Sequence, residues 1–199
     1  MKRLTMLLVG WMLSTIAVEA APTESIPWKE VGGWSVLMDP SLGNACYVST
    51  AYEDGTVLRL GFNLSSAEGS IYIALGNENW KSLEAGKDYQ IQIAFDAETP
   101  WDAPARAMEL SGINWLNVQT TDTNFAAEFA RKHTMRATFE GRSVAMLRLK
   151  GSSKALDEML ACQEAVKAYS ANREPTAPPR GDPFAPSPQV KSATDPFDL

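Results

Sequence analysis

The sequence predicts a mainly β domain with two helices: a β-sandwich-like or open-barrel antiparallel core, a C-terminal helix tethered by a disulfide, and a disordered tail. Three observations predict this α+β fold class. Residues 34–149 consist mostly of short runs in which apolar and polar side chains alternate, which is the period of half-buried strands. Two segments, 125–133 and the stretch that follows residue 151, change to a helical period. The last 28 residues hold seven of the chain's twelve prolines.

The N-terminus has the pattern of a secretory signal. Lys2 and Arg3 form a basic region, residues 4–18 form a short apolar run, and small residues lead to Ala20, after which the chain becomes polar. The run is shorter than the about 20 apolar residues that a membrane span needs. We therefore expect a signal peptide over residues 1–20, cleaved after Ala20, and a periplasmic or secreted protein with no integral membrane span after cleavage.

The remaining chain is expected to hold a lead segment and one domain. Residues 21–33 form the lead segment, and residues 34–171 form a single β-rich globular domain. The turn Glu53-Asp54-Gly55 joins two alternating runs, which predicts a hairpin. The expected strands are 34–38, 46–52, 56–63, 70–76, 89–95, 106–110, 134–139 and 143–149, with a proline-interrupted link at 100–104.

The first of the two expected helices is short. Phe125 and Phe129 lie four residues apart with alanines beside them, which is typical of an amphipathic helix. Asp122 or Thr123 can cap its first turn. His133, the only histidine, falls near its C-terminal end, where a positive charge suits the helix dipole. A cap or surface role is therefore favoured over a catalytic role for this histidine.

The second expected helix carries one of the chain's two cysteines. Ser152 or Ser153 is expected to cap its start, and the helix bears an apolar stripe with a period near 3.6. Cys162 lies in that stripe, whereas Cys46 lies in an expected strand. An isolated, widely separated pair in an oxidising compartment is usually a disulfide, and the Cys-x-x-Cys spacing of redox-active pairs is absent. We expect a structural bridge between Cys46 and Cys162 that ties the last helix to the sheet.

Residues 172–199 are expected to form a proline-rich disordered tail. The segment has too few apolar groups to offset the entropy of ordering it. Within it the tripeptide Asp-Pro-Phe occurs twice, ending at Phe184 and at Phe197. These two side chains are candidate contacts for a partner, and sequence drift in a linker is the alternative interpretation.

Composition bears on the class of partner. Without residues 1–20 the chain has 16 basic and 23 acidic side chains, a formal charge of −7. An acidic protein repels phosphate backbones and anionic head groups, so neither nucleic acid nor a lipid surface is expected as a partner. Another envelope or exported protein is the expected partner. Trp80 and Trp101, which lie in loop-like settings, are candidate contacts, with a role as core caps as the alternative.

The sequence predicts no catalytic, cofactor or metal site. One histidine and a bridged cysteine pair are too few ligands for a histidine or thiolate zinc site. The sequence contains no nucleophile elbow and no phosphate-binding glycine loop. Carboxylates are the one remaining basis for an enzyme, acting on glycans, although solvated roles are favoured for all of them. The five candidates are Asp39, Glu53, Asp54, Asp96 and Glu98.

The end of the expected domain resembles a known family. The segment consists of an expected strand at 135–139, the turn Glu140-Gly141-Arg142, a strand at 145–149 and the run LRLKGSSKAL at 147–156. Together with the opening Gly33-Trp34-Ser35-Val36, it is similar to the invasion-associated locus B family of bacterial periplasmic proteins. The resemblance implies a small β-rich envelope protein without a known catalytic centre. The chain has fewer cysteines than that family's pattern, and another group of exported proteobacterial proteins is the alternative.

Three functions are compatible with these features. The leading hypothesis is an exported, non-enzymatic periplasmic binding or protein-interaction module. An inhibitor or immunity protein for a secreted toxin or cell-wall enzyme is the alternative, because acidic surfaces complement basic enzymes. A carboxylate-dependent glycan hydrolase is the third.

Overall fold

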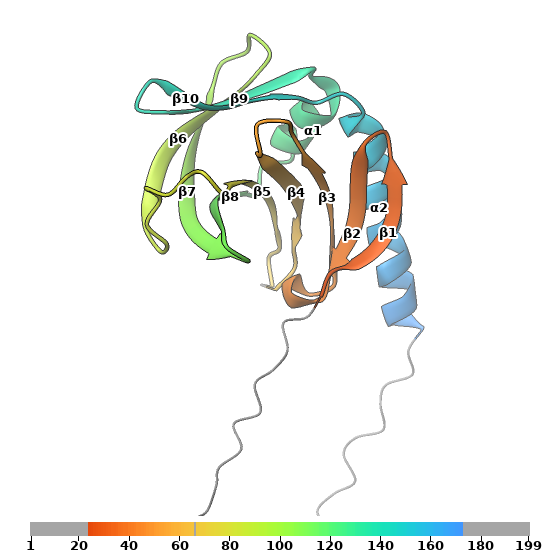
Figure 1. The fold of residues 1–199 in the computed structure, drawn as a ribbon. Coiled ribbons are helices and arrows are strands. Elements are labelled where there is room, and N and C mark those ends of the chain that lie inside the picture. Colours follow the sequence, from red (N-terminus) through yellow and green to blue (C-terminus); the bar gives the residue numbers. More distant parts are fainter. Residues whose placement is uncertain (1–23, 66, 173–199) are drawn as a thin grey trace, which may run out of the picture.

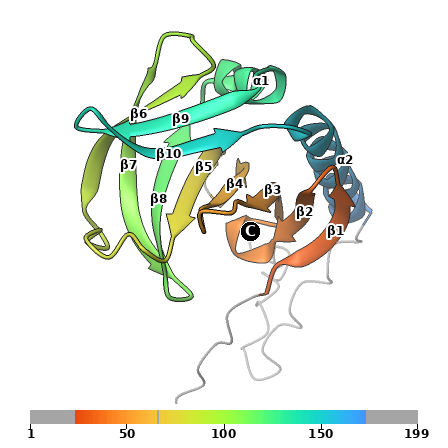
Figure 2. The same ribbon diagram turned by 45° about the horizontal axis from the view of Figure 1, so that its top comes forward.

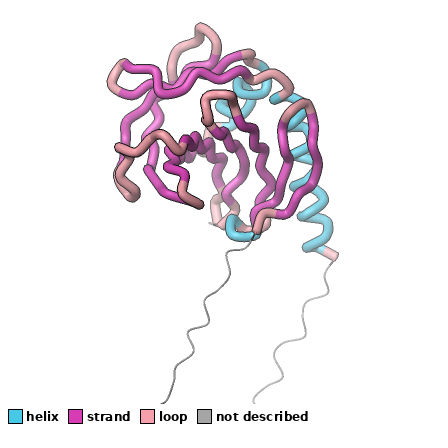
Figure 3. The backbone as a smooth tube through the Cα atoms, viewed as in Figure 1, coloured by secondary structure: helices cyan, strands magenta, loops and turns pink. Residues whose placement is uncertain are grey.

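The computed structural model describes residues 24–65 and 67–172. The expected signal peptide lies outside these residues, as does the expected tail from residue 173 onward with Phe184 and Phe197. Strands make up most of the described backbone (Figure 3). They are β1 (Ile26–Val31), β2 (Trp34–Asp39), β3 (Ala45–Ala51), β4 (Val57–Asn63), β5 (Ser70–Asn77), β6 (Asp88–Phe95), β7 (Trp101–Leu110), β8 (Ile113–Thr120), β9 (Thr134–Phe139) and β10 (Arg142–Arg148). The helices are η1 (Pro40–Leu42), α1 (Thr123–Arg131) and α2 (Ser152–Ala171).

All ten described strands belong to one antiparallel sheet, in the order β1-β2-β3-β4-β5-β8-β7-β6-β9-β10. The sheet is open, because β1 and β10 are not paired with each other, and it is strongly curled (Figures 1 and 2). The curl brings β10, the last strand, close to the third strand: the hydroxyl of Tyr52, just after β3, donates to the carbonyl of Arg148 at the end of β10 (2.8 Å). The expected open-barrel antiparallel core is therefore confirmed.

The inner face of the curled sheet forms the main core. Neighbouring positions on five strands, β3, β4, β5, β8 and β7, line up as one row of apolar side chains. This row consists of Val48, Leu60, Ile73, Val118 and Ala105, all buried. Because side chains of a strand alternate between its faces, the next residue along each strand points to the outer face. The alternation that the sequence shows therefore sorts the residues between core and outer face.

A smaller apolar cluster lies on the outer face. The indole ring of Trp115 in β8 lies over Gly76 in β5, where a Cβ atom would come within 2.5 Å of the ring. The guanidinium of Arg59 stacks 4.8 Å from the centre of that ring and 5.4 Å from the ring of Tyr47. Glycine at position 76 is therefore required by the close approach of the tryptophan.

Both α helices pack against the inner face. Phe129 of α1 makes edge-to-face contacts with Trp34 of β2 and Phe95 of β6, with ring centres 5.7 and 6.4 Å apart. These two strands lie far apart in the sheet order, so α1 fills the interior of the curl at one end. The carboxylate of Asp122 accepts from the backbone N–H of Asn124, which confirms the expected cap of this helix.

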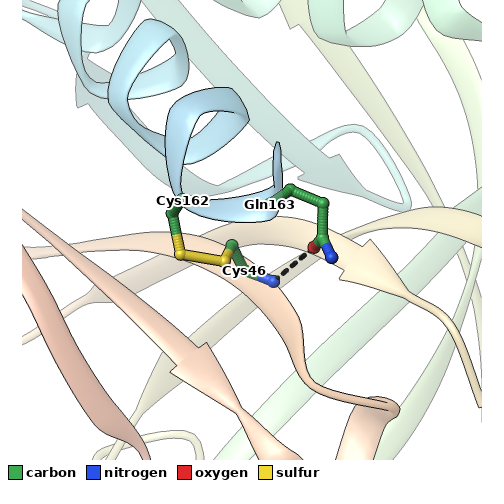
Figure 4. Close-up of a disulfide and its surroundings, with 3 residues drawn as sticks. All are labelled: Cys46, Cys162 and Gln163. Carbon is green, nitrogen blue, oxygen red and sulfur yellow. Dashed lines mark hydrogen bonds between the residues drawn. A yellow bond between two sulfur atoms is a disulfide. The ribbon is translucent and has the colours of Figure 1, made fainter. Parts of the chain in front are cut away.

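The second helix is joined to the sheet by a covalent bond. Cys162 of α2 forms a disulfide with Cys46 of β3, and their Cα atoms are 6.2 Å apart (Figure 4). Beside the bridge, the side-chain oxygen of Gln163 accepts from the backbone N–H of Cys46 at 2.8 Å (Figure 4). The expected bridge is confirmed, and such a bond is characteristic of proteins in oxidising compartments. Among the helices of residues 24–65 and 67–172, none combines the length and apolar character that a membrane crossing requires.

The structure differs from the sequence expectations at three strands. The sheet begins with β1 inside the expected lead segment, β7 runs through the expected proline-interrupted link, and β8 was not expected as a strand. In β7 the inner positions are Ala103, Ala105 and Ala107, so the apolar alternation is weak because alanine is a poor strand former. Pro104 lies where β7 pairs with β6 but not with β8, so its missing N–H costs no ladder hydrogen bond.

The start of α2 also differs from the expectation. Its N-cap is Gly151, with a positive φ of 89°, rather than a serine side chain. The hydroxyl of Ser152 instead donates to the carbonyl of Phe129 (3.1 Å), which ties α2 to α1.

Candidate functional site

A pocket of about 350 Å³ opens between the β5–β6 loop and the inner face of the sheet. We call it the Trp80 pocket. Its wall residues come from the loop and from four strands, β6, β8, β9 and β10. They are Asn79, Trp80, Lys81, Ser82, Leu83, Tyr89, Ile91, Leu116, Phe139 and Val144. The mouths of β-barrels are a common location for ligand sites, and the volume falls within the range of small-molecule pockets.

The loop that covers the pocket is anchored at its beginning by Asn77, the buried last residue of β5. The side-chain amide of Asn77 donates to the carbonyl of Asp54 (3.2 Å) and to the hydroxyl of Thr56 (3.1 Å) in the β3–β4 turn. Its side-chain oxygen accepts from the backbone N–H of Asn79 (2.9 Å). The side chain of Asn77 thus forms hydrogen bonds with both the β3–β4 turn and the β5–β6 loop, and it fixes where the loop leaves the sheet.

Trp80 itself is held by its backbone. Its N–H donates to the carbonyl of Asn77 (3.2 Å), and its carbonyl accepts from the N–H of Leu83 (3.1 Å). The same carbonyl accepts from the side-chain amide of Asn114 in β8 (3.1 Å). The indole is therefore presented by a loop whose conformation is set by hydrogen bonds, so little ordering is required when a ligand binds.

The opposite wall is formed by aromatic and branched side chains of the sheet. The rings of Tyr89 and Phe139 meet edge to face with centres 5.6 Å apart. Val144 reaches the pocket because β10 has an irregular register between Ser143 and Ala145. The deeper wall residues are continuous with the main core. An apolar group that enters this pocket would therefore exchange water for contacts with carbon atoms on most sides.

Polar groups lie at the rim of the pocket. Asn79, Lys81 and Ser82 belong to the loop, and the hydroxyl of Tyr89 accepts from the backbone N–H of Glu84 (3.1 Å). In the part of the chain that the structure describes, no group of three or more His, Cys, Asp or Glu side chains is placed to hold a metal ion. The chemistry of the pocket is accordingly that of apolar binding with polar groups at the opening.

The two candidate tryptophans have different surroundings. Trp80 lines the pocket and is half-buried. Trp101 is the first residue of β7 and packs on α1, where its ring meets Phe125 edge to face at 5.6 Å. Its indole N–H donates to the carboxylate of Glu128 (2.9 Å). Trp101 therefore links the sheet to α1, and a partner contact through either tryptophan stays a prediction.

The five candidate carboxylates lie at three separate turns. Asp39 accepts from Ser41 at the start of η1. Glu53 and Asp54 belong to the β3–β4 turn, and Asp96 and Glu98 belong to the β6–β7 turn. None of the five lines the Trp80 pocket.

Asp96 has a structural function at its turn. Its carboxylate accepts from the backbone N–H of Thr134 (2.8 Å), from the hydroxyl of Thr134 (3.0 Å) and from the backbone N–H of His133 (3.1 Å). Desolvation works against its ionisation, but these hydrogen bonds outweigh it and hold the pKa of Asp96 below its ordinary value. The side chain of His133 is 91% exposed, which agrees with the surface role expected for it.

Most wall residues of the pocket were not singled out from the sequence. Tyr89, Ile91 and Phe139 fall on the apolar positions of alternating runs in expected strands and are indistinguishable there from ordinary core residues. Leu116 lies in a strand that was not expected. The one sequence signal for this site is an aromatic residue, Trp80, in a polar loop.

Comparison with known proteins adds information about the fold. No protein-family model matches the sequence, and no curated protein matches it. The structure is similar to the crystal structure of invasion associated protein B from Bartonella henselae, with a TM-score of 0.51. The match covers 70% of this chain and 99% of that chain at 14% sequence identity. At that identity the likeness shows a shared fold alone, and it confirms in the architecture the resemblance that the closing segment of the sequence indicates.

Proposed function

We propose that this chain is an exported, non-enzymatic binding module whose ligand places an apolar group in the Trp80 pocket. The observation that carries the proposal is a preformed apolar pocket at the mouth of the curled sheet, under a loop held by hydrogen bonds. Export is supported by the signal pattern of residues 1–20 and by the Cys46–Cys162 disulfide.

The shape of the pocket limits what the ligand presents. About 350 Å³ accommodates an aromatic ring or a branched aliphatic group, but not a whole protein element. The remainder of the ligand projects past the rim, where Asn79, Lys81 and Ser82 supply hydrogen-bonding groups. An apolar side chain of another exported protein meets this description, as does the apolar part of a small molecule.

A neutral fluorescent probe tests the pocket directly. N-phenyl-1-naphthylamine carries no charge at neutral pH, so its emission reports apolar binding without contributions from surface charge. We expect saturable binding to the mature chain. Val144→Phe, which places a larger ring at the wall, should weaken binding at least about tenfold because it occupies the space of the probe.

The matched control is Met146→Phe. Met146 lies two residues further along the same strand and is 61% exposed, so the same ring is added outside the pocket. Binding should persist in this variant, and both variants should unfold within a few degrees of the wild type. Absence of saturable binding to the wild type, or equal loss of binding in both variants, would contradict the proposed site.

A further inference from the structure

The charge of this acidic chain is unevenly distributed. Residues 131–154 hold seven Lys and Arg side chains and His133, against Glu140 as the one acidic residue. The other described residues hold six Lys and Arg against 18 Asp and Glu. Although the protein is acidic overall, it therefore contains a basic segment, which comprises the end of α1, the β9–β10 hairpin and the start of α2.

The fold gathers part of this segment around a second pocket, of about 440 Å³, which we call the basic pocket. Thr134 of β9 pairs with Arg148 of β10, and the N–H of Leu149 donates to the carbonyl of His133 (2.8 Å). This pairing brings residues 131–133 beside residues 148–150. The pocket is lined by four Lys and Arg residues, Arg131, Lys132, Arg148 and Lys150, together with His133.

Three of these four Lys and Arg side chains have no acidic partner among residues 24–65 and 67–172. Lys132 pairs with Glu98, and the ring of His133 lies 3.8 Å from the carboxylate of Asp96. Arg131, Arg148 and Lys150 form no ion pair with any described residue. Glu53 and Asp54 line a neighbouring depression with Arg148 but lie outside ion-pair distance of it. Like charges that are gathered in this way repel one another, and a bound anion removes that cost.

We infer that the basic pocket binds a phosphate group. Arginine guanidinium groups match the oxygen atoms of phosphate with paired N–H donors, and lysine adds a point charge that suits its multiple negative charge. Gly151, Ser152 and Ser153 also line the pocket, so the positive end of the α2 dipole adds to the attraction.

This site is separate from the Trp80 pocket. The two lie at opposite ends of the β9–β10 hairpin, because Phe139 and Val144 line one pocket whereas Thr134 and Arg148 line the other. Five residue steps along β9 correspond to roughly 17 Å. The inference therefore extends beyond the proposed apolar function and does not depend on it.

Phosphate can come from two sources, which the experiment distinguishes. In one arm the mature chain is titrated with inorganic phosphate at low salt and followed by calorimetry. In the other arm it is sedimented with phosphatidylcholine vesicles that contain or lack phosphatidylglycerol. Binding in the first arm identifies a free phosphate ion as a ligand, and binding confined to vesicles with phosphatidylglycerol identifies a lipid head group.

Variants decide whether the basic pocket is responsible. The triple variant Arg131→Gln, Arg148→Gln, Lys150→Gln should weaken binding in the active arm at least about tenfold. The control triple Lys29→Gln, Arg106→Gln, Lys167→Gln makes the same change in net charge at exposed positions elsewhere and should retain binding.

Each remaining outcome has a defined meaning. Equal weakening in both triples would show that net charge alone is responsible and would overturn the inference, as would absence of binding in both arms. Thermal unfolding establishes that both triples are folded. If the first triple fails to fold, the single change Lys150→Gln at an exposed side chain replaces it, with a several-fold loss expected and an unchanged affinity as the refuting result.

Discussion

Removing the disulfide should destabilise the domain strongly. Cys46 and Cys162 are separated by 116 positions in the sequence, and both side chains are buried. For a closed loop of that length, the chain-entropy model gives a stabilisation of about 5 kcal/mol, because the bridge restricts the unfolded chain. Changing both residues to alanine should lower the free energy of unfolding by about this amount. Alanine is chosen over serine because a buried serine hydroxyl would lack a hydrogen-bond partner.

The prediction can be checked by urea and thermal unfolding of the mature chain. For a domain of this size, a loss of about 5 kcal/mol corresponds to a decrease in Tm of roughly 10–20 °C. Reductant added to the wild type should reproduce the behaviour of the double variant, because it breaks the same bond. The single change Gln163→Ala is the matched control: it keeps the bridge but leaves the buried Cys46 N–H without its acceptor, at a cost of about 1–3 kcal/mol.

The result that refutes this reasoning is specific. A double variant that loses no more free energy than Gln163→Ala would show that the bridge contributes little beyond its local contacts. An unfolding curve of the wild type that does not respond to reductant would show that the cysteines are not joined in the mature protein.

Two further predictions concern the sheet and its turns. Gly76→Ala should destabilise the domain by about 1–3 kcal/mol in chemical denaturation, because the new Cβ atom would lie 2.5 Å from the ring of Trp115. A loss of only a few tenths of a kcal/mol would contradict the tight packing. Asp96→Asn should destabilise at neutral pH, and its difference from the wild type should shrink as the pH falls below about 4. A lowered carboxyl pKa gives stability that is present above the unfolded pKa and lost as the pH falls through the folded pKa. If the difference in unfolding free energy between Asp96→Asn and the wild type did not change with pH, this account would be ruled out.

The parts of the fold that local chemistry determines could be predicted from the sequence. The Asp54-Gly55 turn joins β3 to β4, and Asp122 caps α1, because each depends on residues only a few positions apart. The bridge was also predictable, since the N-terminal pattern predicts export to an oxidising compartment and two cysteines allow one pairing.

The first half of β7 escaped prediction because it lacks a local signal. In β7 the buried face consists of alanines, whose burial becomes evident only when β6 and β8 are placed on either side. Pro104 adds a contrary signal, because proline is normally excluded from paired strands. The structure resolves the conflict by leaving that stretch of β7 unpaired on one side.

The two sites escaped prediction for different physical reasons, which bear on how they work. The Trp80 pocket consists of side chains of the same kind as the core, so it becomes visible only where the curled sheet leaves space beneath the β5–β6 loop. The basic pocket was hidden because a net charge sums over the whole chain, whereas an anion interacts with the charges within roughly 10 Å of it. Residues of the β9–β10 hairpin line both sites. Just after β10, the carbonyl of Lys150 accepts from the indole N–H of Trp34 in β2 (3.0 Å), which ties this end of the hairpin to the first strands. The pairing of β9 with β10 therefore brings the cations together at one end of the hairpin and places Phe139 and Val144 in the apolar pocket at the other end.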